Sequence, residues 1–514
     1  MLYKDTLDTL PSYLYFAEQI KRGEAECAEK LSIDMYQLME KAGHAVFDCI
    51  IANFAKSSSI CILAGNGNNG GDAYVVARLA LQSELPVRVF CSDPNRILAG
   101  DAETARQSFL AAGGNLEKFD AFFRLSEAPS LIVDGLLGTG FSGELRTEVE
   151  ILIEAVNAFN SQVIAIDLPS GLNSDTGAVT SVAVLANYTV CMVALKVGCF
   201  TADGPDQCGH MLFAGLGIDQ LFVDHYPAAA ELIRFETLTK IDKRRFNTHK
   251  GTYGHVICVG GDSGMAGAIF LAAKAALRSG AGKVSVLTHE ENVAIVTQMC
   301  PELMVSAIGS QKATAITVNK LKLASAVILG PGLGRTSWGR SVFKQMQLLL
   351  KESDAPLILD ADGLNLLSEQ HSWPLKAPLV LTPHPLEAAR LLQKTVQWVQ
   401  SNRVEAATEL SKKYVAVCVL KGTGSVVSGH SYCGINASGN PGMATAGMGD
   451  VLTGVIAANV GNRDAAADKL SANVKNAVFL HGLAGDYTAK FGEIGIIASD
   501  VIACLPKAID FCSN

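Results

Sequence analysis

Short runs of uninterrupted hydrophobic residues alternate along the chain with longer amphipathic stretches. In the first half the runs occupy residues 59–65, 86–90, 131–135 and 162–167. In the second half they occupy residues 255–261, 283–288, 326–332, 356–363, 379–384 and 415–422. Because these runs are apolar throughout, and not only at every second position, each strand is expected to be buried on both faces. The pattern therefore predicts parallel sheets with helices on both sides.

The stretch between the two series of strands predicts a domain boundary. Residues 226–250 are more charged than their surroundings and contain no strand followed by a glycine loop. A chain of 514 residues is longer than one hydrophobic core usually serves, and a hydrophobic content of 49% is enough for two. We expect two domains, 1–225 and 246–514, joined by a linker at 226–245. Each should be a three-layer αβα fold of the α/β class, with ligands at the carboxyl ends of its strands.

Composition and charge narrow the range of partners. Charged residues make up 18% of the chain, the formal net charge is −8, and lysine and arginine are dispersed, so nucleic acid is not an expected partner. No apolar run reaches membrane-spanning length, and the first residues lack the features of a signal or transit peptide. The thirteen cysteines contain no C-x-x-C pair and mostly lie in apolar runs. We expect reduced thiols, a cytoplasmic location and no membrane binding.

Three strand ends in the first half carry polar residues. The first strand runs into GNGNNGGD (65–72), in outline a strand, glycine loop and helix that cradle a phosphate, although the spacing matches neither G-x-G-x-x-G nor a P-loop. Asp134 precedes a second glycine-rich segment, and Asp167 precedes Ser170. Because neighbouring strands of a parallel sheet end at one crevice, Asn69 and these three residues could share a site.

The side chains at these strand ends offer oxygen ligands, without His or Cys at ligand spacing. That set argues against zinc and for a hard cation or a hydroxyl-rich ligand. Neutral oxygens with one carboxylate suit a monovalent ion better than magnesium. The alternative is that Asp134 and Asp167 only cap helices or brace loops. Lys196 ends another apolar run and could meet an anionic substrate, although a single lysine usually faces solvent.

The motifs NNGGD, VDGLLGTGFSG and IDLPSG resemble the YjeF N-terminal domain, the NAD(P)H-hydrate epimerase family, over roughly the first 225 residues. Residues 1–43 are similar to the helical start of that family. The resemblance implies a Rossmann-like domain in which Asn69, Asp134 and Ser170 coordinate K⁺. It also implies that Asp167 contacts the substrate and is the candidate for proton transfer. The implied substrate-binding set is Asn68, Asn69, Gly70, Gly71, Asp72, Gly138, Thr139, Gly140, Phe141, Ser142, Gly143 and Glu144.

In the second half, the segment NPGMATAGMGD (440–450) combines glycines with a carboxylate ahead of a hydrophobic run that resembles a helix. This arrangement aims backbone N–H groups and a helix N-terminus at an anion and places Asp450 as a base beside it. The alternative is an ordinary glycine-rich turn that ends in an N-capping Asp. KGTGS (421–425) follows a strand and supplies a cation and bare backbone for a nucleotide. His384 ends another strand, where a structural role is the commoner one.

The order GPGLG, DADGLN, TPHPLE, KGTGS and GMGD is similar to the ADP-dependent NAD(P)H-hydrate dehydratases, a branch of the ribokinase-like superfamily, over about residues 235–514. The resemblance implies that Ala268, Gly334, His384 and Asp450 contact the substrate and that Asp450 is catalytic. It implies ADP as co-substrate, with Mg²⁺. The implied nucleotide-binding set is Lys421, Gly422, Thr423, Gly424, Ser425 and Gly449. The chain departs from the expected pattern at Leu386, where a glycine is expected.

With both halves present, the chain resembles fused hydrate-repair enzymes. Such an enzyme interconverts the R and S epimers of hydrated NADH and NADPH (NADHX and NADPHX). It then dehydrates the S epimer with ADP, giving AMP, phosphate and the reduced dinucleotide. We also expect a homo-oligomer. The alternative that remains open is a ribokinase-like small-molecule kinase fused to a noncatalytic Rossmann-like binding module.

Overall fold

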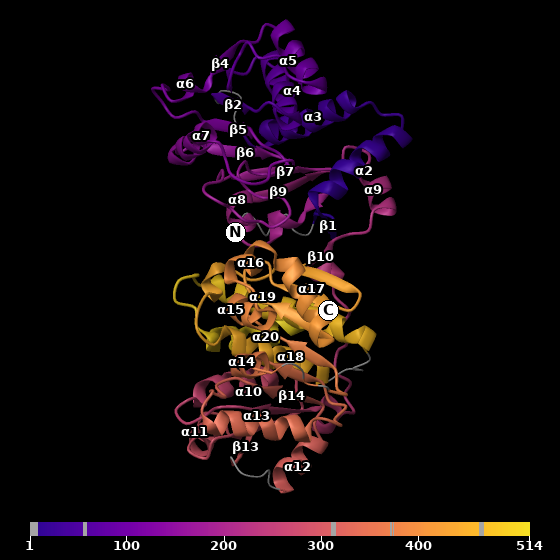
Figure 1. Cartoon of the computed structure of the whole chain (residues 1–514), viewed down its shortest axis with the longest axis vertical. Coiled ribbons are helices and arrows are strands. Elements are labelled where there is room, and N and C mark those ends of the chain that lie inside the picture. The colour runs from indigo at the N-terminus through magenta and orange to yellow at the C-terminus, as the bar shows by residue number, and fades with distance from the viewer. Residues whose placement is uncertain are drawn as a thin grey trace. The chain divides into compact units, whose positions relative to one another are not determined.

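The computed structural model describes residues 9–54, 59–309, 315–370, 373, 375–461 and 467–513. The chain divides into two compact units, Met1–Glu231 and Leu232–Asn514 (Figure 1). The stretch predicted as a linker contains the strand β10 (Ala230–Ile233) and the 3-10 turn η3 (Phe235–Thr237). The first eight residues of the expected helical start lie outside the described residues.

The first unit is built on a parallel sheet with the strand order β4-β3-β2-β5-β6-β7-β9. Its described strands are β1 Tyr13–Tyr15, β2 Ile60–Ala64, β3 Val87–Cys91, β4 Leu116–Lys118, β5 Leu131–Gly135, β6 Gln162–Ile166, β7 Tyr188–Met192, β8 Leu195–Lys196 and β9 His210–Ala214. Its described helices are α2 Ala17–Lys30, α3 Met35–Asn53, α4 Asn68–Gln82, α5 Gly100–Ala111, α6 Phe119–Phe122, α7 Thr147–Ala158, α8 Gly204–Cys208 and α9 Asp219–His225.

Successive residues of β2 enter two different hydrophobic cores. Ile60 and Ile62 pack in the core that includes residues of α3 and α4, whereas Cys61 and Leu63 pack in the core that includes residues of α6 and α7. Successive side chains of a strand point to opposite faces, so this sheet is covered on both sides. The predicted three-layer arrangement is confirmed for the first unit.

The NNGGD segment does not form the predicted glycine loop. It is the first turn of α4, which begins at Asn68. Its glycines serve close packing: a Cβ on Gly70 would lie 2.0 Å from the carbonyl oxygen of Gly65, and one on Gly71 would lie 2.6 Å from the side chain of Met39. Glycine is therefore required here because the helix packs tightly against its surroundings, and the loop itself is only Gly65–Gly67.

The second unit contains a mixed sheet whose parallel part has the order β13-β12-β11-β14-β15-β16-β17, followed by the antiparallel β18 and β19. The described strands are β11 His255–Val259, β12 Lys283–Thr288, β13 Met304–Ala307, β14 Ala326–Leu329, β15 Leu357–Leu359, β16 Leu379–Leu381, β17 Ala416–Leu420, β18 Val426–Gly429 and β19 Tyr432–Asn436. The described helices are α10 Ala266–Arg278, α11 Asn292–Met299, α12 Ala315–Lys322, α13 Ser337–Leu349, α14 Asp362–Ser368, α15 Pro385–Leu392, α16 Val396–Ser401, α17 Arg403–Tyr414, α18 Met448–Gly461, α19 Ala467–Ala489 and α20 Ala498–Cys512.

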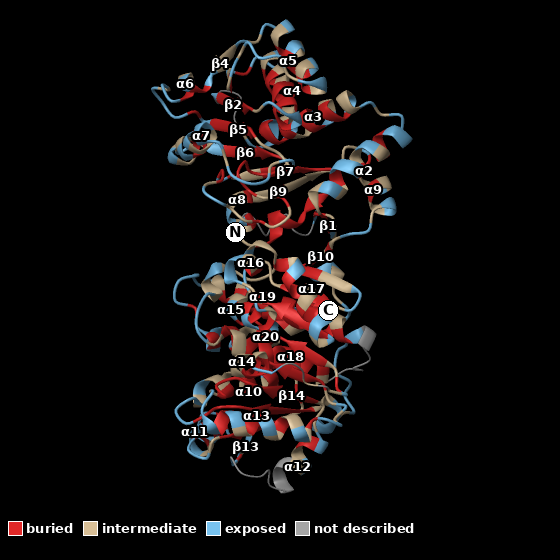
Figure 2. Ribbon diagram, in the orientation of Figure 1, coloured by how far each residue is buried: buried red, intermediate tan, exposed pale blue. Residues whose placement is uncertain are grey.

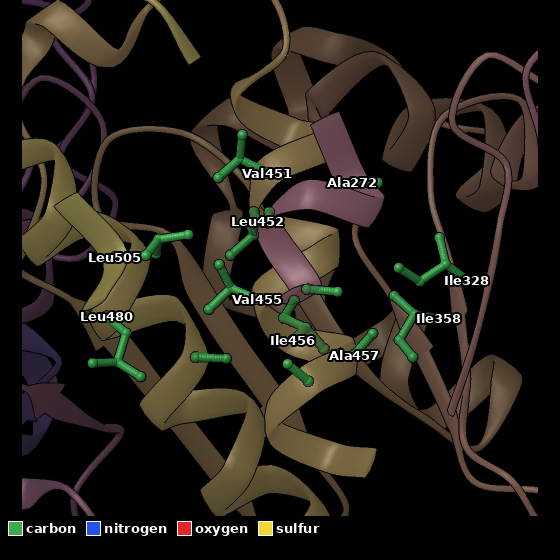
Figure 3. Close-up of a cluster of buried hydrophobic side chains, with 14 of the residues drawn as sticks. Ala272, Ile328, Ile358, Val451, Leu452, Val455, Ile456, Ala457, Leu480 and Leu505 are labelled. Atoms are coloured by element: carbon green, nitrogen blue, oxygen red, sulfur yellow. The ribbon is translucent and has the colours of Figure 1, made fainter. Parts of the chain in front are cut away.

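Helix α18 is buried inside the second unit. From Val451 to Val460 every residue is buried, because the helix packs against strands β14 and β15 on one side and against other helices elsewhere. Figure 3 shows Val455 and Ile456 among side chains of β14, β15, α10, α19 and α20. In Figure 2 the strands of both units are largely buried and the outer faces of helices are exposed. The N-terminus of α18, which carries Asp450, is consequently held by the core.

The thirteen cysteines are all free thiols, and eleven of them are buried. The predicted location of the cysteines in the core is confirmed for most of them. Within the described ranges, no helix combines the length and the apolar character that a membrane crossing requires.

Candidate functional site

A cavity of about 850 Å³ opens at the carboxyl ends of β2, β5 and β6 in the first unit. This is where ligands bind in open parallel sheets. The predicted residues that line it are Asn68, Asn69, Asp72, Gly138, Thr139, Gly140, Phe141, Ser142, Glu144 and Asp167. Gly70 and Gly71 lie behind this wall, in the packing contacts described above. Gly143, with a φ of 93°, has open space around the position that a Cβ would take.

Asn69, Asp134 and Ser170 come together around the backbone of Leu137. Asn69 donates a hydrogen bond from Nδ2 to the Leu137 carbonyl (2.7 Å). The Leu137 N–H donates to Ser170 Oγ (2.9 Å), and Ser170 Oγ donates to Asp134 Oδ1 (2.6 Å). The Leu136 and Ser170 N–H groups also donate to Asp134. Asp134 therefore braces two loops, as the alternative interpretation predicted, and in doing so gathers oxygen atoms from three side chains.

Asp134 is completely buried. Burial raises its pKa to about 6, although the hydrogen bonds from Ser170 and Leu136 act in the opposite direction. A buried carboxylate with few positive neighbours is stabilised by a bound cation. One carboxylate with neutral amide, hydroxyl and carbonyl oxygens fits a monovalent hard cation, and the Leu137 carbonyl is a donor that the sequence did not indicate.

Lys196 is fully buried, so the expectation that it faces solvent is wrong. Its Nζ forms an ion pair with Asp167 Oδ1 and donates to the Met192 carbonyl (2.9 Å) and to Cys191 Sγ (3.5 Å). Burial alone lowers the pKa of the Lys196 ammonium, but the charge of Asp167 outweighs it and the pKa is raised. Asp167 is held in a left-handed conformation (φ 68°), which for a non-glycine residue is unusual and typical of functional sites.

The wall that carries Asp167 and Lys196 also includes Glu24 of α2, which the sequence analysis did not single out. Burial first, and then the charge of Asp167, raise the pKa of Glu24 to about 7. The pKa of Asp72 is also raised, by burial and by the charges of Asp167 and Glu24. Without a distinctive motif around it, Glu24 could be found only after α2 had been placed against the sheet.

In the second unit, Lys421 is held at the end of β17 by acidic side chains. Its Nζ donates to Asp360 Oδ1 (2.7 Å) and lies 3.9 Å from Glu387 Oε2. Asp360 is almost completely buried and also accepts hydrogen bonds from Thr382 (2.9 Å) and Thr453 (2.9 Å). Burial lowers the pKa of Lys421, but the charges of Asp360 and Glu387 together raise it by more, so the net shift is upward.

Asp450 lies in the first turn of α18, which begins at Met448, so the interpretation of Asp450 as an N-capping residue is wrong. A Cβ on Gly449 would lie 3.2 Å from Lys421 Nζ, which places the glycine segment directly beside the lysine. Burial, followed by the charge of Asp360, raises the pKa of Asp450 to about 7. Gly447 has a φ of 86°, a conformation that glycine allows.

His384 caps α15, which is the structural role that the sequence left open. Its Nδ1 accepts hydrogen bonds from the Leu386 and Glu387 N–H groups (3.1 and 3.3 Å). The His384 N–H in turn donates a hydrogen bond to Glu387 Oε2 (2.8 Å), which completes a capping box. Leu386 is an exposed residue in the first turn of this helix, so its position does not require the expected glycine.

Two other predicted residues lie along the neighbouring strand ends. Gly334 (φ 69°) receives support from Asp362, whose Oδ2 accepts from the Gly334 N–H (3.0 Å). A Cβ there would approach Asp262 Oδ2 to 2.8 Å. Ala268 packs near Gly332 in the same glycine segment.

The KGTGS segment is a turn between β17 and β18. Gly422 has a φ of 132°, and Ser425 Oγ donates to the Gly422 carbonyl (3.0 Å). The buried Arg403 donates to the carbonyls of Leu420 and Lys421 (3.3 and 3.2 Å) and so braces this turn. Thr423 is exposed and Gly424 is partly exposed.

Several residues that support the second site were not predicted from the sequence. Asp360 directly follows β15 in the DADGLN motif, and Glu387 lies in the first turn of α15 in the TPHPLE motif, so both had a usable signal. The buried His481 of α19 had no such signal: it contacts the backbone of Met448, and burial lowers its pKa to about 4. The structure thus brings Lys421, Gly449 and Asp450 together around Asp360.

The chain is similar to known proteins over nearly its whole length. The family described as "YjeF-related protein N-terminus" matches residues 35–198, and the family described as "NAD(P)H-hydrate dehydratase" matches residues 256–507. The bifunctional NAD(P)H-hydrate repair enzyme Nnr of Escherichia coli (strain K12) is 37% identical over 508 residues, which cover 98% of this chain and 95% of that protein. The enzyme of the same name from Coxiella burnetii is 39% identical over 491 residues, with coverage of 95% and 97%.

A solved ribokinase-like superfamily protein from Enterococcus faecalis also resembles the chain. It has a TM-score of 0.50 and 27% identity, and the match covers 56% of this chain and 98% of that one. The predicted fold class, α/β with a ribokinase-like part, is confirmed.

Proposed function

We propose that this chain, which belongs to the family of bifunctional NAD(P)H-hydrate repair enzymes, carries an epimerase in residues 1–225 and an ADP-dependent dehydratase in residues 246–514. The substrates are NADHX and NADPHX. The observation that carries the proposal is the environment of the Asp450 carboxyl group. It lies at a helix N-terminus beside Gly449 and Lys421, and no described residue forms a hydrogen bond with it.

In the epimerase half, the 850 Å³ cavity receives the hydrated dinucleotide. Asn69, Asp134 and Ser170 hold K⁺, and the Leu137 carbonyl lies within the same cluster. Asp167 contacts the substrate and takes part in proton transfer. Its ion pair with Lys196 keeps the carboxylate at a defined place on the cavity wall.

In the dehydratase half, the hydroxyl group on C6 of the S epimer is a poor leaving group and must be activated. Asp450 accepts the hydroxyl proton while the terminal phosphoryl group of ADP is transferred to the oxygen. The N–H groups around Gly447–Gly449 stabilise the charge on the phosphoryl group. Phosphate then leaves C6 and a ring proton is lost, which yields AMP, phosphate and NADH or NADPH.

The nucleotide lies along the KGTGS turn and Gly449. Lys421 supplies a positive charge near the phosphates, and its ion pair with Asp360 orients the ammonium group. Mg²⁺, when bound with ADP, neutralises phosphate charge. Ala268, Gly334 and His384 contact the hydrated nicotinamide.

The pKa of the Asp450 carboxyl group also suits a general base. With a pKa of about 7, Asp450 is present in its basic form for about half of the molecules at neutral pH. The similarity to repair enzymes over both halves does not favour a small-molecule kinase fused to a noncatalytic module. We further propose a cytoplasmic homo-oligomer whose partners are small molecules rather than nucleic acid or membranes.

Asp450→Asn tests the proposed function, because it preserves the size of the side chain and removes the base. We expect kcat for ADP-dependent dehydration of pure S-NADHX to fall by about 10²- to 10⁴-fold, the usual contribution of a general base. Recovery of absorbance from reduced nicotinamide measures the reaction. Epimerisation of R-NADHX by the same variant serves as the internal control and should be unchanged. Dehydration near the wild-type rate would refute this role of Asp450.

A further inference from the structure

Helix α2 holds Glu24 against the cavity of the first unit. Ile20 and Glu24 are one helical turn apart and both line the cavity, whereas Arg22 pairs with Glu26 on an exposed face. The neighbouring Gly23 fixes the helix, since a Cβ there would lie 2.3 Å from the ring of Phe222 in α9. The direction of the Glu24 side chain is therefore set by tight helix packing.

The carboxyl group of Glu24 is not engaged by a hydrogen bond or ion pair from any described residue. The cavity is also lined by Lys21 of α2, Asp72 of α4, Asp167 after β6 and Lys196 of β8. Lys196 directs its three donors to Asp167, Met192 and Cys191, so it forms no hydrogen bond with Glu24. The carboxyl group of Glu24 therefore lines the cavity without a partner among the described residues and is available to donate or accept a proton.

The surroundings adjust the acidity of this group. Burial, and then the charge of Asp167, raise the pKa of Glu24 to about 7, while the charge of Lys196 opposes the shift. A carboxyl group with a pKa near 7 can both donate and accept a proton at neutral pH. Asp167 differs, because one of its oxygens already accepts from an ammonium group and from the Met192 N–H (3.0 Å).

We propose that Glu24 is a second catalytic residue of the epimerase, which exchanges a proton with the ring nitrogen of the substrate while Asp167 exchanges one with the hydroxyl group. The proposal rests on the epimerase function proposed above. The hydrated ring carries its hydroxyl on C6, next to N1. Opening and closing the N1–C6 bond inverts C6 without an oxidant, a reductant or any other reactant.

Glu24 donates its proton to N1 as the N1–C6 bond breaks, and Asp167 accepts the hydroxyl proton as C6 becomes an aldehyde carbonyl. Rotation about the C5–C6 bond presents the other face of the carbonyl. N1 then re-forms its bond to C6 and returns its proton to Glu24, while the oxygen recovers its proton from Asp167. Both carboxyl groups end in their starting states.

The test is Glu24→Gln in the full-length chain, with pure R-NADHX and no ADP. Formation of the S epimer is followed by chromatographic separation. We expect kcat to fall by at least about 100-fold with little change in KM, because an acid–base group contributes to the transition state. Glu18→Gln on the exposed part of α2 is the matched control and should behave as wild type. ADP-dependent dehydration of S-NADHX by Glu24→Gln should also be unchanged, because this activity is assigned to the second unit, and it shows that the second unit is folded.

Two further measurements separate catalysis from structure. Wild-type epimerisation should decline as pH rises above about 7, because the proton-donating form of Glu24 is lost, and this decline should be absent in Glu24→Gln. Glu24→Asp, which keeps a carboxyl group, should be faster than Glu24→Gln. The role of Glu24 would be overturned by an unchanged rate in Glu24→Gln or by a rise in KM without a fall in kcat. Equal rates in Glu24→Gln and Glu24→Asp would also overturn it. Absence of epimerisation in the wild type would instead overturn the proposed function.

Discussion

Each unit pairs a lysine with a strand-end aspartate, yet the two pairs differ in what remains available to a ligand. Lys196 has a side chain only 1% exposed and directs its donors to Asp167, Met192 and Cys191. Lys421 has a side chain 19% exposed, donates to Asp360 and lies beside Gly449. The first lysine is saturated by the protein, whereas the second retains donor capacity at the proposed nucleotide site.

The difference shows how one pairing serves two purposes. In the first unit the lysine holds a carboxylate in place, so that the aspartate faces the cavity. In the second unit the aspartate, further held by Thr382 and Thr453, holds the lysine in place, so that the ammonium faces the glycine segment. In both cases the strand end supplies a rigid base for one member of the pair.

The comparison predicts that loss of the saturated lysine mainly affects stability. Lys196→Met leaves Asp167 beside a buried apolar side chain, and removal of one member of a buried ion pair costs about 3–5 kcal/mol. Urea unfolding of the full-length chain should show the transition of the first unit at a markedly lower denaturant concentration. Lys118→Met, at an exposed position, is the control. An unfolding profile of Lys196→Met equal to that of the wild type would contradict the stabilising role of the buried Lys196–Asp167 ion pair.

Loss of the second lysine should mainly affect nucleotide binding. Lys421→Met removes a charge-assisted hydrogen bond to phosphate, which is worth about 1.5–3 kcal/mol, or roughly a 10- to 150-fold rise in the KM for ADP. Steady-state dehydration of S-NADHX at varied ADP concentration measures it. Epimerisation should not change. If KM for ADP stays constant while the first unit is destabilised, the assignment of the two lysines is wrong.

The smallest expected effect concerns the aspartate that holds Lys421. The pKa of Asp450 is raised by burial and then by the charge of Asp360, so Asp360→Asn should lower it. Wild-type kcat for dehydration should fall as pH drops through about 7, because Asp450 must be unprotonated to act as a base. In Asp360→Asn this fall should occur at lower pH.

Thr382→Val provides the control for the Asp360 variant. It removes the hydrogen bond from the Thr382 hydroxyl group to Asp360 but keeps the charge of Asp360, so the fall in kcat should remain near pH 7. A pH profile that is identical in wild type and Asp360→Asn would show that Asp360 does not tune Asp450.

Much of the fold could be predicted because strands buried on both faces have a continuous apolar pattern. Each of the hydrophobic runs coincides with all or most of a strand, for example β2 in 59–65 and β17 in 415–422. The helical state of NNGGD could not be predicted, because glycine and asparagine are poor helix formers and only the contacts of Gly70 and Gly71 explain their presence.

The candidate sites were predictable to the extent that chemistry lies at strand ends in recognisable motifs. Asp134, Asp167 and Asp450 could be named for this reason. Glu24 and His481 could not, because each lies in an ordinary amphipathic or apolar helix and reaches its site only through helix packing. The burial of Lys196 could not be predicted, since a single residue does not reveal which acceptors will surround it.

The sequence by itself determined the strand pattern, the two-part organisation and the polar residues that end the strands, because those features depend on local order and hydrophobic periodicity. Only the tertiary structure decided which lysine is saturated and which is available, since this depends on acceptors distant in the chain, such as Asp360 for Lys421. It also decided the acidity of Asp450 and Glu24, because burial and charges from separate elements set the pKa of a carboxyl group.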